Sequence, residues 1–305
     1  MAVNNPYALN FDGVDDYVDL GDIIDVTSRD FTIEMLVLYA GSTEESLQLL
    51  ITNKQNIDDY RFNIEVRPDG TISIYSITTV KGLTSHSSYK LTINKVYFLS
   101  FVRQDNKWHI FVDGEHVDTI EGKSGNIGSN SRWSLGARYG TSDYFFNGVL
   151  DEVRIWNRAL FEPEIKKYMY KQLTGKEPGL VAYYCCEEGG SILQDYTGNG
   201  HDGTIYGASY IEGIADLAEP EPVIISYEAT NITANSATLN GEIIDLANYS
   251  SLDVAFQYSI YPDFSQDIKQ TPIQTVTSPQ LISANINGLN SKKGYYVRIM
   301  AQESS

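Results

Sequence analysis

Two stretches of this sequence decide its fold: Phe11-Asp12-Gly13-Val14-Asp15-Asp16-Tyr17-Val18 and Gly148-Val149-Leu150-Asp151-Glu152-Val153-Arg154-Ile155-Trp156. Each is interpreted as a β-strand with acidic residues at its head, because apolar, β-branched and aromatic residues favour a pleated, half-buried surface. The stretches stand about one domain length apart. We expect the first strand and a late strand of one β-sandwich to lie side by side. Their carboxylates are ligands of the kind that a hard cation prefers.

Short strands continue on both sides of these stretches. Phe31–Val37 is one, and Arg61–Val66 pairs with Thr71–Tyr75 in a hairpin with an Asp-Gly turn. Strands separated by turn signals, with almost no helical periodicity, predict an all-β sandwich or jelly roll. One helix is expected over Glu162–Gln172, where Pro163 suits the first turn.

Composition narrows the class of protein. The chain has 305 residues, which suits two domains, and a net charge of -18, which disfavours nucleic acid as a partner. It has 22 Tyr, a residue suited both to strands and to sugar-binding faces. The adjacent Cys185 and Cys186 point to opposite faces of a strand, so we expect one buried and one exposed.

No apolar run is long enough to insert into a membrane. The start of the chain lacks the basic and apolar regions of a secretion signal. Either the chain is cytosolic or a signal segment has been removed. We favour removal, and with it a secreted or cell-surface location.

The composition changes after about Ile214. Prolines flank acidic residues near the end of 215–222, which predicts an extended linker. We therefore place one domain at 1–214, with 179–212 as a trailing segment that closes it. A second pattern of short strands from Val223 predicts a smaller immunoglobulin-like sandwich over 223–305.

Four segments resemble the laminin-G-like, concanavalin-A-like jelly-roll family, in the order in which its members carry them. The segments are Ala8–Gly13, Phe31–Glu34, Phe111–Gly114 and Phe146–Leu160. The segments Leu173–Tyr184 and Gly198–Thr204 look like the trailing piece of many microbial members. The resemblance covers about two thirds of the chain and implies a concanavalin-A-like jelly roll.

The tail resembles a fibronectin type III-like module of microbial surface proteins. Leu289 and Tyr295 stand six residues apart, as in the tyrosine corner of that fold. The sequence stops just after the strand Tyr295–Ala301, so we expect the last strand to be absent and a sheet edge to be open. The end of the chain itself would explain this. The alternative is that a strand from a neighbouring chain completes the sheet.

Calcium is implied by the family resemblance. Many jelly rolls of this superfamily bind one structural calcium ion on the convex side, near the first strand and an Asp that leads a late strand. By that resemblance Asp151 is the best ligand and Asp12 the next, with backbone carbonyls near Gly21 or Asp30. The alternative is that Asp12 and Asp151 only cap turns and accept hydrogen bonds from backbone amides.

Catalytic patterns are missing from the sequence. Related glucanases carry alternating carboxylates on one strand, because retaining hydrolysis needs an acid and a nucleophile close together. No strand of this chain has that Glu-x-Asp-x-Glu spacing, and Glu34 is a single carboxylate among apolar neighbours. The serines form no nucleophile elbow. We therefore expect that the protein is not an enzyme.

A glycan site is expected on the concave sheet or in the loops at its edge, where aromatic rings stand beside amides or cations. The candidates are Tyr60, Arg61, Trp133, Arg138, Tyr139 and Tyr144. Core packing is the favoured interpretation of Trp133. Tyr139 and Tyr144 flank a polar loop, so we expect their side chains to be exposed.

These observations predict a non-catalytic, extracellular binding or adhesion protein. A calcium-stabilised jelly roll would bind a carbohydrate or a surface protein, and the second module would act as a spacer. One alternative is an accessory region of a larger glycan-degrading enzyme. The other is a filament or sheath subunit that self-assembles through the open edge of its C-terminal sheet.

Overall fold

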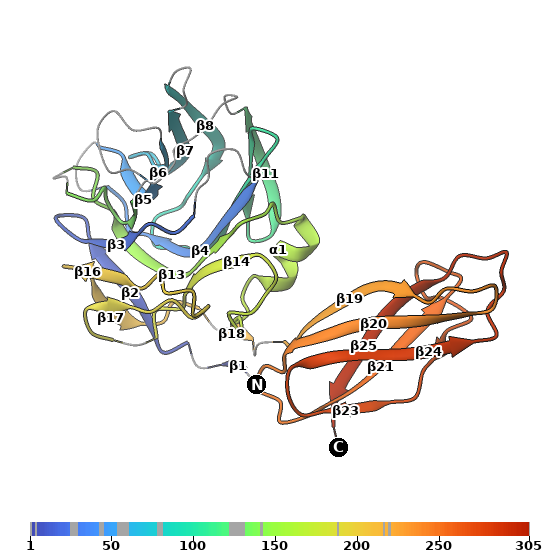
Figure 1. Cartoon of the computed structure of the whole chain (residues 1–305). Coiled ribbons are helices and arrows are strands. Elements are labelled where there is room, and N and C mark those ends of the chain that lie inside the picture. The colour runs from blue at the N-terminus through green and yellow to red at the C-terminus, as the bar shows by residue number, and fades with distance from the viewer. Residues whose placement is uncertain are drawn as a thin grey trace. The chain divides into compact units, whose positions relative to one another are not determined.

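The computed structural model describes residues 2–3, 5–24, 30–42, 46–53, 61–77, 82–121, 132–140, 143–187, 189–215, 217–218 and 221–304. It divides into two compact units, Met1–Glu219 and Pro220–Ser305. Strands make up almost all of its regular structure, and the helix of the described residues is α1 (Glu162–Tyr168). The predicted fold class, an all-β jelly roll with one short helix and a smaller β-sandwich, is confirmed (Figure 1).

The first unit is built from two eight-stranded sheets, here sheet I and sheet II. Sheet I has the order β11 (Glu115–Glu121), β10 (Lys107–Val112), β9 (Val96–Gln104), β4 (Phe31–Tyr39), β13 (Asn147–Trp156), β2 (Tyr7–Asp12), β17 (Ser209–Glu212). Its eighth strand, β14 (Leu180–Tyr184), also pairs with β13. Sheet II has the order β15 (Ile192–Leu193), β16 (Gly203–Tyr206), β3 (Tyr17–Gly21), β12 (Trp133–Leu135), β5 (Gln48–Asn53), β6 (Arg61–Val66), β7 (Thr71–Ile77), β8 (Gly82–Lys90). The short strands β1 (Ala2–Val3) and β18 (Leu217–Ala218) pair with each other.

The first strand and a late strand lie side by side, as the sequence predicts. β2 and β13 are antiparallel, with Asp12 opposite Asn147 and Leu9 opposite Leu150. The trailing segment adds strands to both sheets, because β14 pairs with β13, β16 with β3 and β17 with β2.

The main core lies between the two sheets and is rich in aromatic rings. Phe62 packs against Trp133 and Trp108, with ring centroids 5.3 Å and 5.5 Å apart. Trp133 is fully buried, so the interpretation of this residue as core is confirmed.

A second hydrophobic layer covers the outer face of sheet I. Ile165 of α1 packs there with Val102 and Trp156, whose side chains point away from the main core. Cys185 is buried in this layer and Cys186 in the main core. The expectation of one exposed cysteine is therefore wrong, because the layer over sheet I also buries outward-pointing side chains.

The second unit is a smaller sandwich. One sheet has the order β19 (Val223–Thr230), β20 (Ser236–Asp245), β24 (Gln280–Asn287). In the other, β21 (Leu252–Ser259) pairs with β22 (Lys269–Gln270), β23 (Gln274–Val276) and β25 (Tyr296–Glu303). Within the described residues, β25 pairs with β21 alone. Its inward side chains Val297, Ile299 and Ala301 are only partly buried.

Among the helices of the described residues, none has the length and apolar character that crossing a membrane requires.

Candidate functional site

The two outer faces of the first unit differ in what covers them. Strand alternation sends every second side chain of each sheet away from the main core. On sheet I several outward side chains, among them Val102, Phe111 and Trp156, lie under α1 and the segment that follows it. On sheet II several outward side chains reach solvent, and the candidate glycan residues that the structure describes lie on or beside this face.

A β-bulge in β13 sets the polar groups of the covered face. The register with β4 shifts between Asp151 and Arg154, and Glu152 has a φ of 52°. A bulge adds one residue to a strand and re-aims the side chains beside it. Asp151 and Glu152, neighbours in sequence, therefore both point to the outer face.

Glu152 and Arg154 form a buried ion pair at 2.5 Å, and both side chains are fully buried. The Tyr183 hydroxyl donates to Glu152, and the Arg154 guanidinium donates to the backbone carbonyls of Tyr168 and Lys171. Burial is the largest influence and alone would lower the pKa of Arg154, but the charges of Glu152, Tyr183 and Glu34 together outweigh it and the net pKa is raised. The pair ties the segment after α1 to sheet I.

Glu34 lies beside this pair on the same face. Its carboxylate accepts hydrogen bonds from the Ser100 hydroxyl at 3.1 Å and the Trp156 indole at 3.0 Å. Burial raises the pKa of Glu34, while the Arg154 charge opposes the shift. Full burial under these partners makes Glu34 a structural group.

Asp151 lies at the other end of the covered face and is fully buried. Its carboxylate accepts from the Asn5 amide at 2.8 Å and from the Glu152 backbone amide at 2.8 Å. Burial raises the pKa of Asp151 well above its usual range, and the Glu152 and Glu187 charges add to this rise. Within the described residues, the buried Asn5 Oδ1 has no hydrogen-bond donor. These oxygens, with Glu187 close by, fit the ligand preference of a hard cation.

Asp12 does not meet Asp151. It lies opposite Asn147, four residues before Asp151 and so about 13 Å away along the strand. Its carboxylate accepts from the Val14 backbone amide at 2.8 Å, as a turn-capping Asp does. The structure therefore does not bring the two predicted metal ligands to one ion. Asp12 instead approaches Asp15 and Asp16, with carboxylate oxygens within 4.8 Å of one another.

Three tyrosines gather on the outer face of sheet II. The rings of Tyr17 and Tyr206 stack with centroids 4.6 Å apart and an interplanar angle of 10°. Tyr139 meets Tyr17 edge-on at 6.2 Å, and Tyr206 is 42% exposed. With Arg132 and Asp19, these side chains form what we call the tyrosine patch.

Arg132 and Asp19 hold the patch in place. The Arg132 guanidinium donates to both carboxylate oxygens of Asp19, with Nε 2.5 Å from Oδ1. It also lies over the Tyr139 ring, 4.0 Å from the centroid. The patch thus offers ring faces beside a charged pair whose position is fixed.

Arg138 and Tyr144 lie next to the patch and pair with each other. The Arg138 guanidinium stands 4.6 Å from the centre of the Tyr144 ring. Glu65, on β6, is 2% exposed, and the positive charge of Arg138 acts on its carboxyl group. Burial raises the pKa of Glu65 to about 7, while Asn63 and Arg138 oppose the rise.

Of the predicted glycan residues, Tyr139, Tyr144 and Arg138 lie beside this face. Tyr60 and the side chain of Arg61 lie outside the described residues. Sequence reasoning missed Tyr17, Tyr206, Arg132 and Asp19. The alternation of β3 around the buried Val18 already placed Tyr17 and Asp19 on the outer side. Nothing local showed that Tyr206 would lie beside Tyr17.

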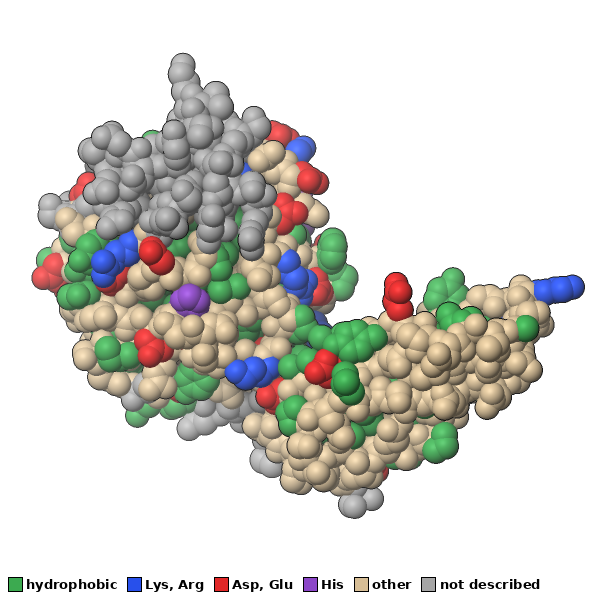
Figure 2. All heavy atoms as spheres, in the orientation of Figure 1, with side chains coloured by type: hydrophobic (Ala, Val, Ile, Leu, Met, Phe, Trp, Pro, Cys, Tyr) green, Lys and Arg blue, Asp and Glu red, His purple; other side chains and the backbone are tan. Residues whose placement is uncertain are grey.

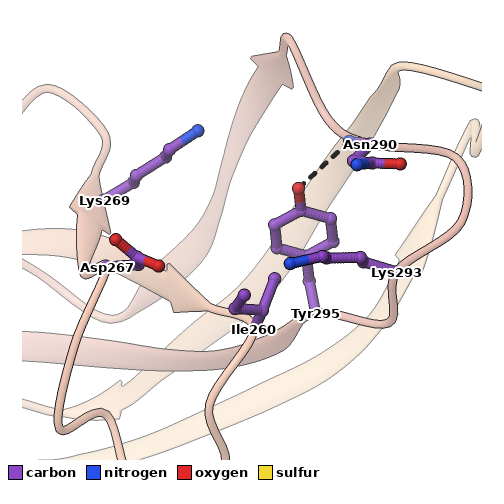
Figure 3. Close-up of a pocket in the computed structure, with 6 residues that line it drawn as sticks. All are labelled: Ile260, Asp267, Lys269, Asn290, Lys293 and Tyr295. Carbon is purple, nitrogen blue, oxygen red and sulfur yellow. Dashed lines mark hydrogen bonds between the residues drawn. The ribbon is translucent and has the colours of Figure 1, made fainter.

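The second unit contains a separate pocket of about 250 Å³ around Tyr295 (Figure 3). The Tyr295 hydroxyl accepts a hydrogen bond from the Asn290 backbone amide at 3.0 Å. The charged side chains of Asp267, Lys269 and Lys293 at its rim are exposed. The hydrogen bond has the form of a tyrosine corner, and the pocket surrounds this structural contact.

Comparison with solved structures finds proteins that are similar to this chain in fold. A protein from Bacteroides ovatus, provisionally named a carbohydrate-binding protein, is 19% identical with a TM-score of 0.57. The match covers 71% of this chain and 62% of that protein, so this chain spans less than two thirds of its length. At this identity the likeness shows the fold alone.

Two further matches are weaker, with TM-scores below 0.5. Domain 4 of the arabinanase AbnA from Geobacillus stearothermophilus, in complex with arabinotriose, is 16% identical with a TM-score of 0.44, over 52% of this chain and 75% of that one. The CBM40 of the Ruminococcus gnavus IT-sialidase, bound to α2,3-sialyllactose, is 14% identical with a TM-score of 0.42, over 54% and 98%.

The comparison with curated proteins finds no match. A family model described as the concanavalin A-like lectin/glucanases superfamily matches residues 12–166, just over half of the chain. This range runs from the end of β2 into α1 and includes strands of both sheets of the sandwich. The chain therefore belongs to the concanavalin A-like lectin/glucanases superfamily.

Proposed function

We propose that the first unit is a non-catalytic carbohydrate-binding module and that the tyrosine patch binds the sugar. The stacked pair of Tyr17 and the exposed Tyr206 is the observation that carries this proposal. Aromatic rings pack on the apolar faces of sugars, and the Tyr hydroxyls remain free to bond sugar hydroxyls. The name of the Bacteroides ovatus protein agrees with this class of ligand.

The patch is prepared for binding before a ligand arrives. Asp19 fixes Arg132, which in turn packs on Tyr139, so these side chains have little freedom left to lose. Lower ordering cost on binding leaves more of the contact energy for affinity.

The spacing of the two buried carboxyl groups on the strands of this face, Asp19 and Glu65, supports a non-catalytic role. Asp19 is on β3 and Glu65 on β6, and two strands lie between them. Three strand spacings amount to roughly 14 Å. Glycoside hydrolysis uses carboxyl groups about 5–5.5 Å apart when retaining and about 6.5–9.5 Å apart when inverting. This pair suits neither geometry.

We also propose that Asp151, Asn5 and Glu187 hold a structural calcium ion. The buried, unbonded Asn5 Oδ1 and the raised pKa of Asp151 support it, because a buried carboxylate ionises readily once a cation stands beside it. The ion would tie the chain before β2 to β13, and it supplies no chemistry to the patch.

For the second unit we propose a fibronectin type III-like spacer. The contact between Tyr295 and Asn290 and the three-plus-four arrangement of strands support this assignment. A secreted or cell-surface location is part of the same proposal. Self-assembly along the free edge of β25 stays a prediction, and concentration-dependent polymers in analytical ultracentrifugation would support it.

The function is tested by glycan binding with single-ring deletions. Tyr17→Ala and Tyr206→Ala should each weaken binding by about tenfold, because each removes roughly 50 Å² of apolar ring surface that a sugar would cover, at about 25 cal/mol per Å². Tyr139→Ala should weaken it less, because its ring meets Tyr17 only at the edge.

The matched control is Tyr7→Ala. Tyr7 is 45% exposed and meets Tyr210 edge-on, but it lies on β2 of sheet I. Isothermal titration against glycans selected on an array should show no change for this variant. Unaltered binding in both Tyr17→Ala and Tyr206→Ala would exclude the patch as the site.

A further inference from the structure

We propose that the tyrosine patch selects uncharged glycans and rejects glycans that carry carboxylate or sulfate groups. This inference rests on the proposed function of the patch and names the chemical class of its ligand. It follows from how the charged side chains in and around the patch are paired.

The guanidinium of Arg132 is already engaged. An arginine recognises an anion best through two parallel N–H bonds to its oxygens. Arg132 already binds Asp19 in this way, because its Nε and one terminal nitrogen both donate to the carboxylate. The Tyr139 ring covers the guanidinium face at 4.0 Å. An anionic sugar could take the same two-bond geometry only by displacing Asp19, whose side chain is only 5% exposed.

Arg138 is held in a similar way. Its guanidinium lies over the Tyr144 ring, and its charge acts on the carboxyl group of Glu65. Both arginines therefore already pack against a tyrosine ring of the protein, and Arg132 is also paired with Asp19.

A cluster of three carboxylates lies in the turn that leads into Tyr17, one of the two stacked rings. The turn that leads into Tyr17 contains Asp12, Asp15 and Asp16, whose carboxylate oxygens lie within 4.8 Å of one another. Asp16 also approaches the residue after Tyr206, since a Cβ added to Gly207 would lie 2.0 Å from Asp16 Oδ1. Like charges brought together at an interface repel each other and weaken binding.

The charge of the whole molecule acts in the same direction. The net charge is -18. On the face drawn in Figure 2, the described side chains show scattered acidic and basic groups and no broad basic area. An uncharged sugar meets no electrostatic barrier at the patch, whereas an anionic sugar is repelled.

The test compares neutral oligosaccharides with chains of the same backbone and length that carry uronic acid or sulfate groups. At low salt we expect the neutral chains to bind at least tenfold more tightly. High salt should narrow the ratio, because ions screen the repulsion between charges. Equal or tighter binding of the anionic chains overturns the selectivity but leaves the binding function standing. Binding of neither class overturns the proposed function and this inference with it.

Asp19→Asn is the decisive variant, because it releases the Arg132 guanidinium. We expect the ratio of neutral to anionic affinity to fall by about tenfold. Asp15→Asn, at an exposed position, should lower the ratio by a smaller factor and serves if Asp19→Asn folds poorly by circular dichroism. Glu228→Gln makes the same change in net charge on β19 of the second unit and should leave the ratio unaltered. A ratio unaffected by both Asp19→Asn and Asp15→Asn contradicts the proposal.

Discussion

The two outer faces of the first unit show how similar strand patterns lead to different roles. Glu34, Glu152 and Arg154 point outward from sheet I, yet all three are fully buried under α1 and the segment after it. Tyr17 and Arg132 point outward from sheet II and keep part of their surface in water. Charge at an outward strand position therefore does not identify a site. What matters is whether a later part of the chain covers it.

The covered face uses its charges for structure. Its three fully buried carboxylates, Glu34, Asp151 and Glu152, each have a hydrogen-bond donor or a cation, because an unpaired buried charge costs several kcal/mol. The open face uses a fixed ion pair to hold aromatic rings toward solvent. The following predictions test this contrast, beginning with the largest effect.

Arg154→Met should lower the free energy of unfolding of the first unit by about 3–5 kcal/mol, because it leaves the Glu152 carboxylate buried without its cation. Urea denaturation measures the loss, and glycan affinity of the folded protein should not change. Lys107→Met is the control, since the Lys107–Glu121 pair is exposed, water screens it, and its loss should cost far less stability. Equal losses in the two variants would contradict the assignment of a structural role to Arg154. Adding Glu152→Gln to Arg154→Met should recover part of the stability.

Calcium should stabilise the covered face and not the patch. At a concentration 100 times its dissociation constant the ion would add about 2.7 kcal/mol, or roughly 5–10 °C in Tm for a unit of this size. Asp151→Asn should abolish the calcium-dependent shift, measured by calorimetry with and without chelator. Asp12→Asn is the matched control and should retain the shift. Unchanged wild-type stability in chelator would exclude the calcium proposal.

Glu65 should make the open face pH-sensitive to a smaller extent. Its pKa rises from 4.5 to about 7 on folding because of burial. The folded state therefore holds a proton that the unfolded state releases, and stability falls as pH increases between these values. From pH 5.5 to 7.5 the wild type should lose about 2 kcal/mol relative to Glu65→Gln. Parallel stability curves for the two proteins over this interval would show that Glu65 does not titrate there.

Much of the fold could be predicted because its signals are local. Alternating strands such as Phe31–Tyr39 and the Asp-Gly turn near Gly70 depend on neighbouring residues. Tyr139 was found because a polar loop follows it. Tyr17 and Tyr206 were missed as a pair because 188 residues separate them in the sequence and their strands meet only in the folded sheet.

The sequence by itself determined that the chain is all-β and that β2 and β13 are neighbours. Side-chain alternation and the family motifs can be recognised because each lies within a short segment. Only the tertiary structure decided which outward side chains are buried under a later segment and which stay exposed to solvent. The bulge at Glu152 and the layer around α1 are long-range effects, since they depend on packing between distant segments. A carboxylate such as Asp151 looks the same in sequence whether it faces water or a buried amide, and its surroundings determine its chemistry.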